Sequence, residues 1–171
     1  MRMFLSIITF VIFLTSCNTN KPASSKLNGV NYKWLDSVKQ AADTTYTKKY
    51  GTIKFATAQY FISKKDSTLC QVMKDTAGII RQVVVTKHNR RTFFAGYYAN
   101  GQLMAQLLLD SFGAYHGAAK YFYQNGSVET EGSYRAGLKT GQWKNYNEIG
   151  KPVSTTEYDT NGQVIKTIGE K

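Results

Sequence analysis

Residues 121–150 read YFYQNGSVETEGSYRAGLKTGQWKNYNEIG and contain the turn signals that decide the fold. Asn125-Gly126 separates two runs in which aromatic or apolar residues alternate with polar ones, and Ile149-Gly150 follows at the end of the next run. Asn-Gly in this setting predicts a β-hairpin with a two-residue type I′ turn, because both central residues of that turn need positive φ. The stretch therefore predicts consecutive antiparallel hairpins.

The same unit recurs toward the N-terminus. Asn100-Gly101 precedes Asn125-Gly126, and Gly78 precedes Gly101 at nearly the same spacing. This near-constant spacing indicates an internal repeat with three clear units and a doubtful one at Gly78. Three positions are equivalent in the three clear units. The first, before the turn, holds Phe94, Ala119 and Trp143. The second, closer to the turn, holds Tyr97, Phe122 and Tyr146, and the third, after the turn, holds Leu109, Tyr134 and Tyr158. The turn and repeat glycines are Gly101, Gly126 and Gly150, with Gly113, Gly117, Gly137 and Gly141 expected in the turns that join the units.

These units predict a mainly β fold, an elongated antiparallel meander of hairpins. Side chains alternate along a strand, so Tyr121 and Tyr123 should face one way and Phe122 the other. A single hairpin is not stable alone, so neighbouring hairpins must supply the buried face.

The motifs Gly141-Gln142-Trp143-Lys144-Asn145-Tyr146 and residues 121–134 resemble MORN-type repeats of the variant (MORN-2) form. Residues 92–164 carry this resemblance, which also extends to YwqK-type antitoxin proteins. It implies a β-sheet scaffold for protein or membrane contact and no catalytic residues. An exported chain fits poorly with a cytoplasmic antitoxin, so an antitoxin-like role ranks third among the functions considered.

The N-terminal segment, residues 1–16, resembles a bacterial lipoprotein signal peptide. Arg2 precedes an apolar run over residues 4–14, which is too short to span a bilayer comfortably, and Leu14-Thr15-Ser16-Cys17 follows it. The resemblance implies cleavage before Cys17, lipidation of that cysteine and, because Asn18 is not an aspartate, a place at the outer membrane. The alternative is an ordinary signal peptide in which Cys17 is incidental.

The remaining sequence divides into a polar tether over residues 17–28, a helix plus β region over 29–90 and the repeat region over 91–171. Apolar spacing predicts one short helix over Tyr32–Ala42. Strands are expected over 53–62 with a bulge, 69–73, 79–86 and 93–98, with a polar turn over 88–91.

The mature chain would be strongly basic. Removing residues 1–16 deletes only Arg2 and leaves 21 basic and 11 acidic residues, with nine lysines but three aspartates in residues 21–66. A basic segment beside a lipid anchor favours an anionic surface, either lipid headgroups or an envelope polymer. The alternative is that the basic excess serves solubility or arose by chance. Nucleic acid is not an expected partner of an exported protein.

The sequence predicts no enzyme, metal site or cofactor. His88 and His116 have no second ligand at metal-binding spacing, and Glu129 and Glu131 are expected on a solvated sheet face. Cys70 lies among apolar residues, which favours a buried structural thiol.

An aromatic row is the candidate interaction surface. It comprises Tyr97, Tyr121, Tyr123, Trp143 and Tyr146. Exposed aromatic rows contact sugars or partner proteins, whereas the alternative is that these rings form the core of a thin sheet. The favoured function is a lipid-anchored envelope scaffold with a protein partner, and the second is a binding module for an anionic or glycan polymer.

Overall fold

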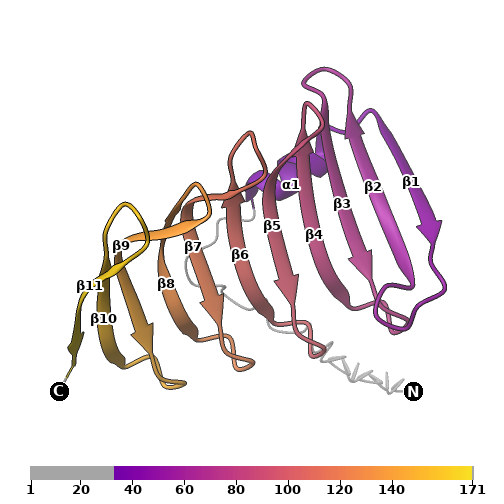
Figure 1. Ribbon diagram of the computed structural model, residues 1–171. Coiled ribbons are helices and arrows are strands. Elements are labelled where there is room, and N and C mark those ends of the chain that lie inside the picture. Colours follow the sequence, from indigo (N-terminus) through magenta and orange to yellow (C-terminus); the bar gives the residue numbers. More distant parts are fainter. Residues whose placement is uncertain (1–32, 171) are drawn as a thin grey trace, which may run out of the picture. The chain divides into compact units, whose positions relative to one another are not determined.

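The computed structural model describes residues 33–170, all within one compact unit. One sheet of 11 strands runs in chain order from β1 to β11, and every neighbouring pair is antiparallel, as the sequence predicts (Figure 1). The strands are β1 (Thr44–Lys49), β2 (Thr57–Ser63), β3 (Thr68–Lys74), β4 (Ile80–Lys87), β5 (Arg90–Tyr97), β6 (Leu103–Leu109), β7 (Tyr115–Phe122), β8 (Val128–Arg135), β9 (Leu138–Tyr146), β10 (Pro152–Tyr158) and β11 (Val164–Gly169).

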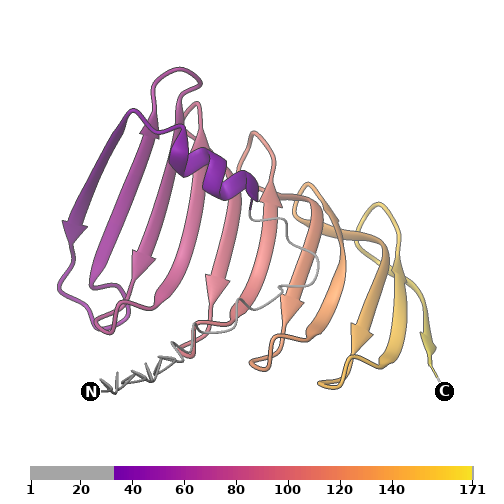
Figure 2. The ribbon, with the colours of Figure 1, turned by 180° about the vertical axis from the view of Figure 1, so that it is seen from behind.

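The single described helix, α1 (Lys33–Gln40), confirms the short N-terminal helix. It lies across one face of the sheet near β2 and β3, as Figure 2 shows in indigo. The Lys39 ammonium lies 6.0 Å from the centre of the Phe61 ring on β2, which identifies the face that α1 covers. The predicted signal peptide, Cys17 and the predicted tether lie outside the described residues.

The loops that contain Gly101, Gly126 and Gly150 each have three residues, so the predicted two-residue type I′ turn is wrong. In the β7–β8 loop the Gly126 amide donates to Tyr123 O (2.9 Å) and the Tyr123 amide to Ser127 O (2.9 Å). Gly126 has a φ of +87°, whereas Asn125 is not among the residues with positive φ. The loop is a type I turn followed by a residue in the left-handed conformation. This residue forms a bulge, which lets the loop match the twist of the two strands.

Within the described residues the same loop occurs six times: 76–78, 99–101, 111–113, 124–126, 148–150 and 160–162. Four of the six follow Asp or Asn, a residue that favours the first position of a type I turn. Asp75 illustrates the reason, because its Oδ1 accepts from the amides of Ala77 and Ile79 at 2.9 Å each. The doubtful unit at Gly78 therefore has the same loop as the three clear units.

Two-residue turns with both residues at positive φ do occur, but elsewhere. They are His88-Asn89 (49° and 60°) and Ala136-Gly137 (49° and 83°). The expected turn over 88–91 is therefore shorter, and Arg90 already belongs to β5.

Gly117 and Gly141 lie inside β7 and β9, so their expected position in joining turns is wrong. Both have positive φ where the register shifts, so each marks an irregularity in its strand.

The first strand is the main element that sequence patterning misses. Residues 51–56 form no strand. The expected strand over 53–62, with its bulge, is therefore reduced to β2, and β2 pairs with β1. Every residue of β1 is exposed, so its sequence TTYTKK carries no apolar alternation to reveal it.

The sheet has a core on each face. On the α1 face, Cys70, Val85 and Phe93 pair across β3, β4 and β5 and are each at most 4% exposed. On the opposite face, Leu107 and Ala119 pair across β6 and β7 and pack with Trp143. A sheet of one layer therefore buries side chains on both sides, under α1 at one end and under its own aromatic rings at the other.

Candidate interaction surface

Trp143 is a core residue. Its side chain is 1% exposed, and its Nε1 donates to the carbonyl oxygen of Ser133 (3.1 Å). The indole lies directly over Gly132, where any Cβ would overlap with ring atoms. Tyr134 meets it edge-on at 4.9 Å, and the Lys139 ammonium lies 4.4 Å from its ring. The alternative interpretation, a thin-sheet core, therefore holds for Trp143.

The aromatic residues do not form one row. Tyr121 shares the face of Trp143, and its hydroxyl lies 3.1 Å from that of Tyr134. Burial, followed by this hydrogen bond, raises the pKa of Tyr121. Tyr146 lies on the opposite face, three residues beyond Trp143, and donates to Glu131 Oε1 (2.8 Å). The predicted surface is thus divided between the two faces.

The α1 face becomes polar beyond β5. Gln106, Lys120, Glu131 and Lys144 are cross-strand neighbours on β6 to β9. The Lys120 ammonium lies 2.6 Å from Glu131 Oε2, and this contact is the main reason that the pKa of Glu131 lies below its usual value. An open recess of about 310 Å³ lies over Lys120, Glu131 and Lys144, with Gln142 also at its wall. Glu131 is held as a carboxylate in a structural ion pair, which makes it a poor general acid.

Successive hairpins are linked along the edge that carries the β5–β6 and β7–β8 loops. The Asn100 side-chain amide donates to Gln124 O (3.0 Å), and that of Asn125 donates to Glu148 O (2.8 Å). The hydroxyls of Tyr98 and Tyr123 likewise donate to Phe122 O and Tyr146 O, both at 2.8 Å. Tyr123, predicted for partner contact, is therefore also part of this lattice, and Tyr97 is half-buried on β5.

The seven predicted repeat glycines all have positive φ. Gly101, Gly126 and Gly150 occupy one edge of the sheet; Gly113 and Gly137 occupy the other; Gly117 and Gly141 lie within strands.

The other chemistry-bearing residues are not brought together. Among residues 33–170 no group of His, Cys, Asp and Glu could hold a metal ion. His88 lies in the β4–β5 turn and His116 in β7. Cys70 is fully buried, and burial raises the pKa of its thiol to about 11, so it is the structural thiol that the sequence predicts. In the same part of the chain no helix has the length and apolarity that crossing a bilayer requires.

One repeat is recognised by comparison with known families. Residues 115–136 match the MORN repeat variant. No curated protein matches the chain. Among solved structures it is similar to the crystal structure of TarM (TM-score 0.35, 12% identity, 60% of this chain covered). It is also similar to a mutant of S. aureus TarM in complex with Fondaparinux, alpha-GlcNAc-glycerol and UDP (TM-score 0.34, 10% identity, 60% covered). The chain spans 22% of the length of each.

A cluster of tyrosines at the first two strands was not predicted from the sequence. The hydroxyls of Tyr50 and Tyr60 lie 2.6 Å apart, and Tyr46 stacks on Tyr60 with ring centres 4.5 Å apart. The hydrogen bond to Tyr50 and burial raise the pKa of Tyr60 to about 12. The three tyrosines are close together in the sequence, which is a visible signal, but their contact depends on the unexpected strand β1.

Proposed function

We propose that this chain is a lipid-anchored protein of the bacterial outer membrane whose repeat sheet is a non-catalytic scaffold for an envelope protein partner. The observation that carries the proposal is the hydrogen-bonded lattice that links Asn100 and Asn125 to the next hairpin. It turns the hairpins into one continuous surface, and open repeat sheets serve as extended binding surfaces. The matched MORN repeat variant supports the scaffold.

The partner contact is assigned to the polar face over β8 and β9. Gln142 is exposed there beside the recess, whereas Thr130 is half-buried on the opposite face. A photo-crosslinking amino acid at Gln142 should give one adduct of discrete mass on irradiation of intact cells. The same photo-crosslinking amino acid at Thr130 reports adducts formed on the other face. At exposed Thr52 it reports adducts formed by random collision. Equal adducts at all three positions, or none, would contradict the scaffold.

The anchor has a separate test. Mass spectrometry of the native protein should find an N-terminus at Cys17 that carries acyl chains, which stabilise membrane attachment through their buried CH₂ groups. Cys17→Ser should leave the uncut precursor, and density-gradient fractionation should find the wild-type chain with outer membranes. An unmodified Cys17 in the native host refutes the anchor and leaves the scaffold standing.

A second candidate is binding of an anionic or glycan envelope polymer, supported by the basic excess of the mature chain. Purified cell wall should retain the protein at low salt and release it at high salt, because exposed charges are screened. Retention that depends only on a protein partner favours the scaffold instead.

A further inference from the structure

Three Asn-Gly pairs lie in loops of the described residues: Asn100-Gly101, Asn125-Gly126 and Asn161-Gly162. Each pair belongs to a three-residue loop, each glycine has positive φ, and each asparagine is exposed. Because glycine has no side chain, its backbone nitrogen is open to close approach by the side chain of the preceding asparagine. The three pairs therefore share their loop type and their access to water, and what distinguishes them is how each asparagine side chain is held.

The side-chain amides of Asn100 and Asn125 are held at both ends. Asn125 Oδ1 accepts from the Ser127 amide (2.9 Å), and its Nδ2 donates to Glu148 O (2.8 Å) in the next hairpin on the same edge. Asn100 makes the equivalent pair of hydrogen bonds, within its own loop and to the next hairpin, each at 3.0 Å. Neither side chain can turn toward the following glycine without breaking these bonds.

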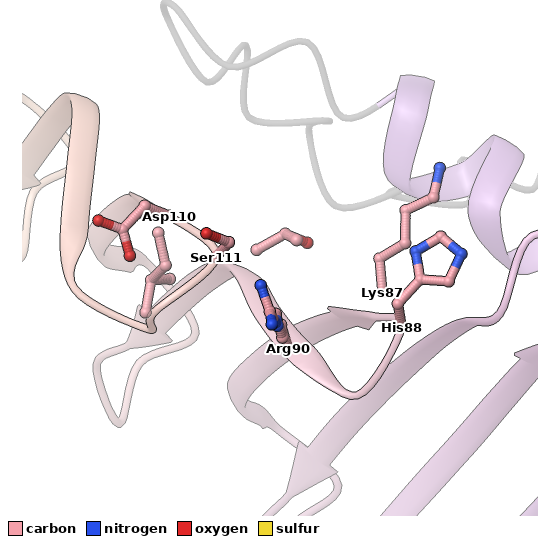
Figure 3. A pocket seen from close by; sticks show the side chains of 7 residues that line it. Lys87, His88, Arg90, Asp110 and Ser111 are labelled. Carbon is pink, nitrogen blue, oxygen red and sulfur yellow. The ribbon is translucent and has the colours of Figure 1, made fainter.

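The Asn161 side chain makes no hydrogen bond to any residue in 33–170. The amide that would reach its Oδ1, that of Gln163, donates instead to Asp159 Oδ1 (2.8 Å), which also accepts from the Asn161 amide (2.8 Å). Asp110, at the start of the 111–113 loop (Figure 3), accepts from two amides in the same way, at 2.8 and 3.0 Å. An aspartate at the start of the loop thus takes the bond that a following asparagine would make.

The other end of the Asn161 amide has no acceptor for a related reason. In the loops of Asn100 and Asn125, Nδ2 reaches the next loop on the same edge, but within residues 33–170 no loop follows 160–162 on its edge. The amide of the loop glycine donates to the carbonyl oxygen of the residue before the loop in all three cases, so that bond does not distinguish the pairs. The difference lies in the side chain of the asparagine.

We propose that Asn161 is a site of spontaneous deamidation in the folded protein, whereas Asn100 and Asn125 are protected by the bonds that join the hairpins. The Gly162 nitrogen attacks Cγ of Asn161 and forms a C–N bond. The bond from Cγ to Nδ2 breaks, and ammonia leaves with the proton of the Gly162 amide. Water then opens the five-membered imide at either carbonyl and gives aspartate or isoaspartate, so one water is consumed for each ammonia released. The reaction requires Cγ and the nitrogen to meet, which an unrestrained side chain permits.

The modification is confined to one end of the sheet. Either product adds a negative charge to the β10–β11 loop, and isoaspartate also adds one carbon to the backbone there. Strand β11 pairs only with β10, so the hairpins that contain Asn100 and Asn125 are not changed. The proposal rests neither on the scaffold nor on acylation at Cys17.

The experiment follows the three pairs in one sample of the wild-type, full-length chain. Folded protein and urea-unfolded protein are incubated side by side at mildly alkaline pH. Mass spectrometry then measures, at each asparagine, the mass change caused by replacing NH₂ with OH. Asn28-Gly29, which lies outside the described residues, falls in another tryptic peptide and does not enter the comparison. Trypsin places the three pairs in separate peptides because it cuts after Arg91, Lys120, Arg135, Lys144 and Lys166.

In urea the three pairs should convert at similar rates, because glycine follows each asparagine. In the folded chain Asn161 should convert about tenfold or more faster than Asn100 and Asn125, since two net hydrogen bonds must break before either of these can react. Equal rates at the three pairs in the folded chain would overturn the proposal. So would the same order of rates in urea, because the order would then come from the local sequence.

Ile149→Asn provides a matched variant on the edge that carries Asn100 and Asn125. Ile149 is 87% exposed in a loop of the same type, so the substitution disturbs no packing. Asn147 Oδ1 already accepts from the Lys151 amide (2.9 Å), and no loop follows on this edge within residues 33–170. The new asparagine should therefore convert nearly as fast as Asn161. Protection equal to that of Asn125 would show that hydrogen bonds of the side chain do not set the rate.

Discussion

Gly132 shows how one missing side chain determines the packing of a face. The indole of Trp143 occupies the space that a Cβ at Gly132 would fill, and Ala119 pairs with Gly132 across β7 and β8. Phe94 and Tyr134 pack against the same cluster. A small residue beside each large ring lets the layer interdigitate without a second sheet to cover it.

Gly132→Ala should therefore lower the free energy of unfolding by about 1–3 kcal/mol, the usual cost of overpacking a core. Urea denaturation followed by circular dichroism measures the change. Gly169→Ala is the control, because a Cβ there meets nothing within 4 Å. Similar losses at both positions would show that Trp143 does not rest on Gly132.

The Lys120–Glu131 pair predicts a pH dependence of stability. The folded-state pKa of Glu131 is lowered, so its contribution is present above the unfolded value of about 4.3 and is lost as pH falls through the lower folded value. Both side chains are about 30% exposed, so the contribution is expected to be under about 1 kcal/mol.

Glu131→Gln should therefore be less stable than wild type at pH 7, and the difference should shrink on acidification below about pH 4.3. Urea midpoints across pH 2–7 would check this. A difference that grows on acidification would reverse the assigned sign.

At the scale of the hairpin, the decisive feature is a side-chain amide that bonds to the following hairpin on the same edge. Asn125 uses Oδ1 to accept from the Ser127 amide within its own loop and Nδ2 to donate to Glu148 O in the next. One side chain thus closes a turn and also joins two repeats.

Asn125→Ala should lower the free energy of unfolding by about 1 kcal/mol or more, since it removes three hydrogen bonds, to Glu148 O and to the amide and hydroxyl of Ser127. Asn161→Ala is the matched control: Asn161 has the same position in the 160–162 loop but makes no comparable bond to another loop within residues 33–170. Asn125→Ala should lower the midpoint temperature of thermal unfolding clearly more than Asn161→Ala. Equal effects would indicate that only the local turn contributes to stability.

For the whole sheet, the distribution of burial predicts where it opens first. Every residue of β1 and β11 is exposed, whereas β4 to β7 contain Val83, Phe93, Leu107 and Ala119, each at most 4% exposed. Each strand of this meander forms its ladder of backbone hydrogen bonds only with its neighbours in the sheet, so we expect each end to open without disrupting the centre.

Hydrogen exchange followed by mass spectrometry should therefore show slow exchange in β4 to β7 and fast exchange in β1 and β11. Gly132→Ala should accelerate exchange in β8 and β9 more than in β3. Uniform protection along the sheet would indicate a single cooperative unit instead.

The sequence by itself determined the meander, because Asn-Gly turns at fixed spacing between alternating runs permit little else, and it determined the buried thiol of Cys70. The tertiary structure decided the type of the loops. The pairing of Tyr98 with Gln102 and of Tyr123 with Ser127 leaves three residues in each of these Asn-Gly loops, which the Asn-Gly pair alone does not specify. The tertiary structure also decided which tyrosines share a face, because each bulge shifts the alternation. Strand β1 and the cluster of Tyr46, Tyr50 and Tyr60 depend on pairing between strands, and pairing has no signature in the residues of either strand alone.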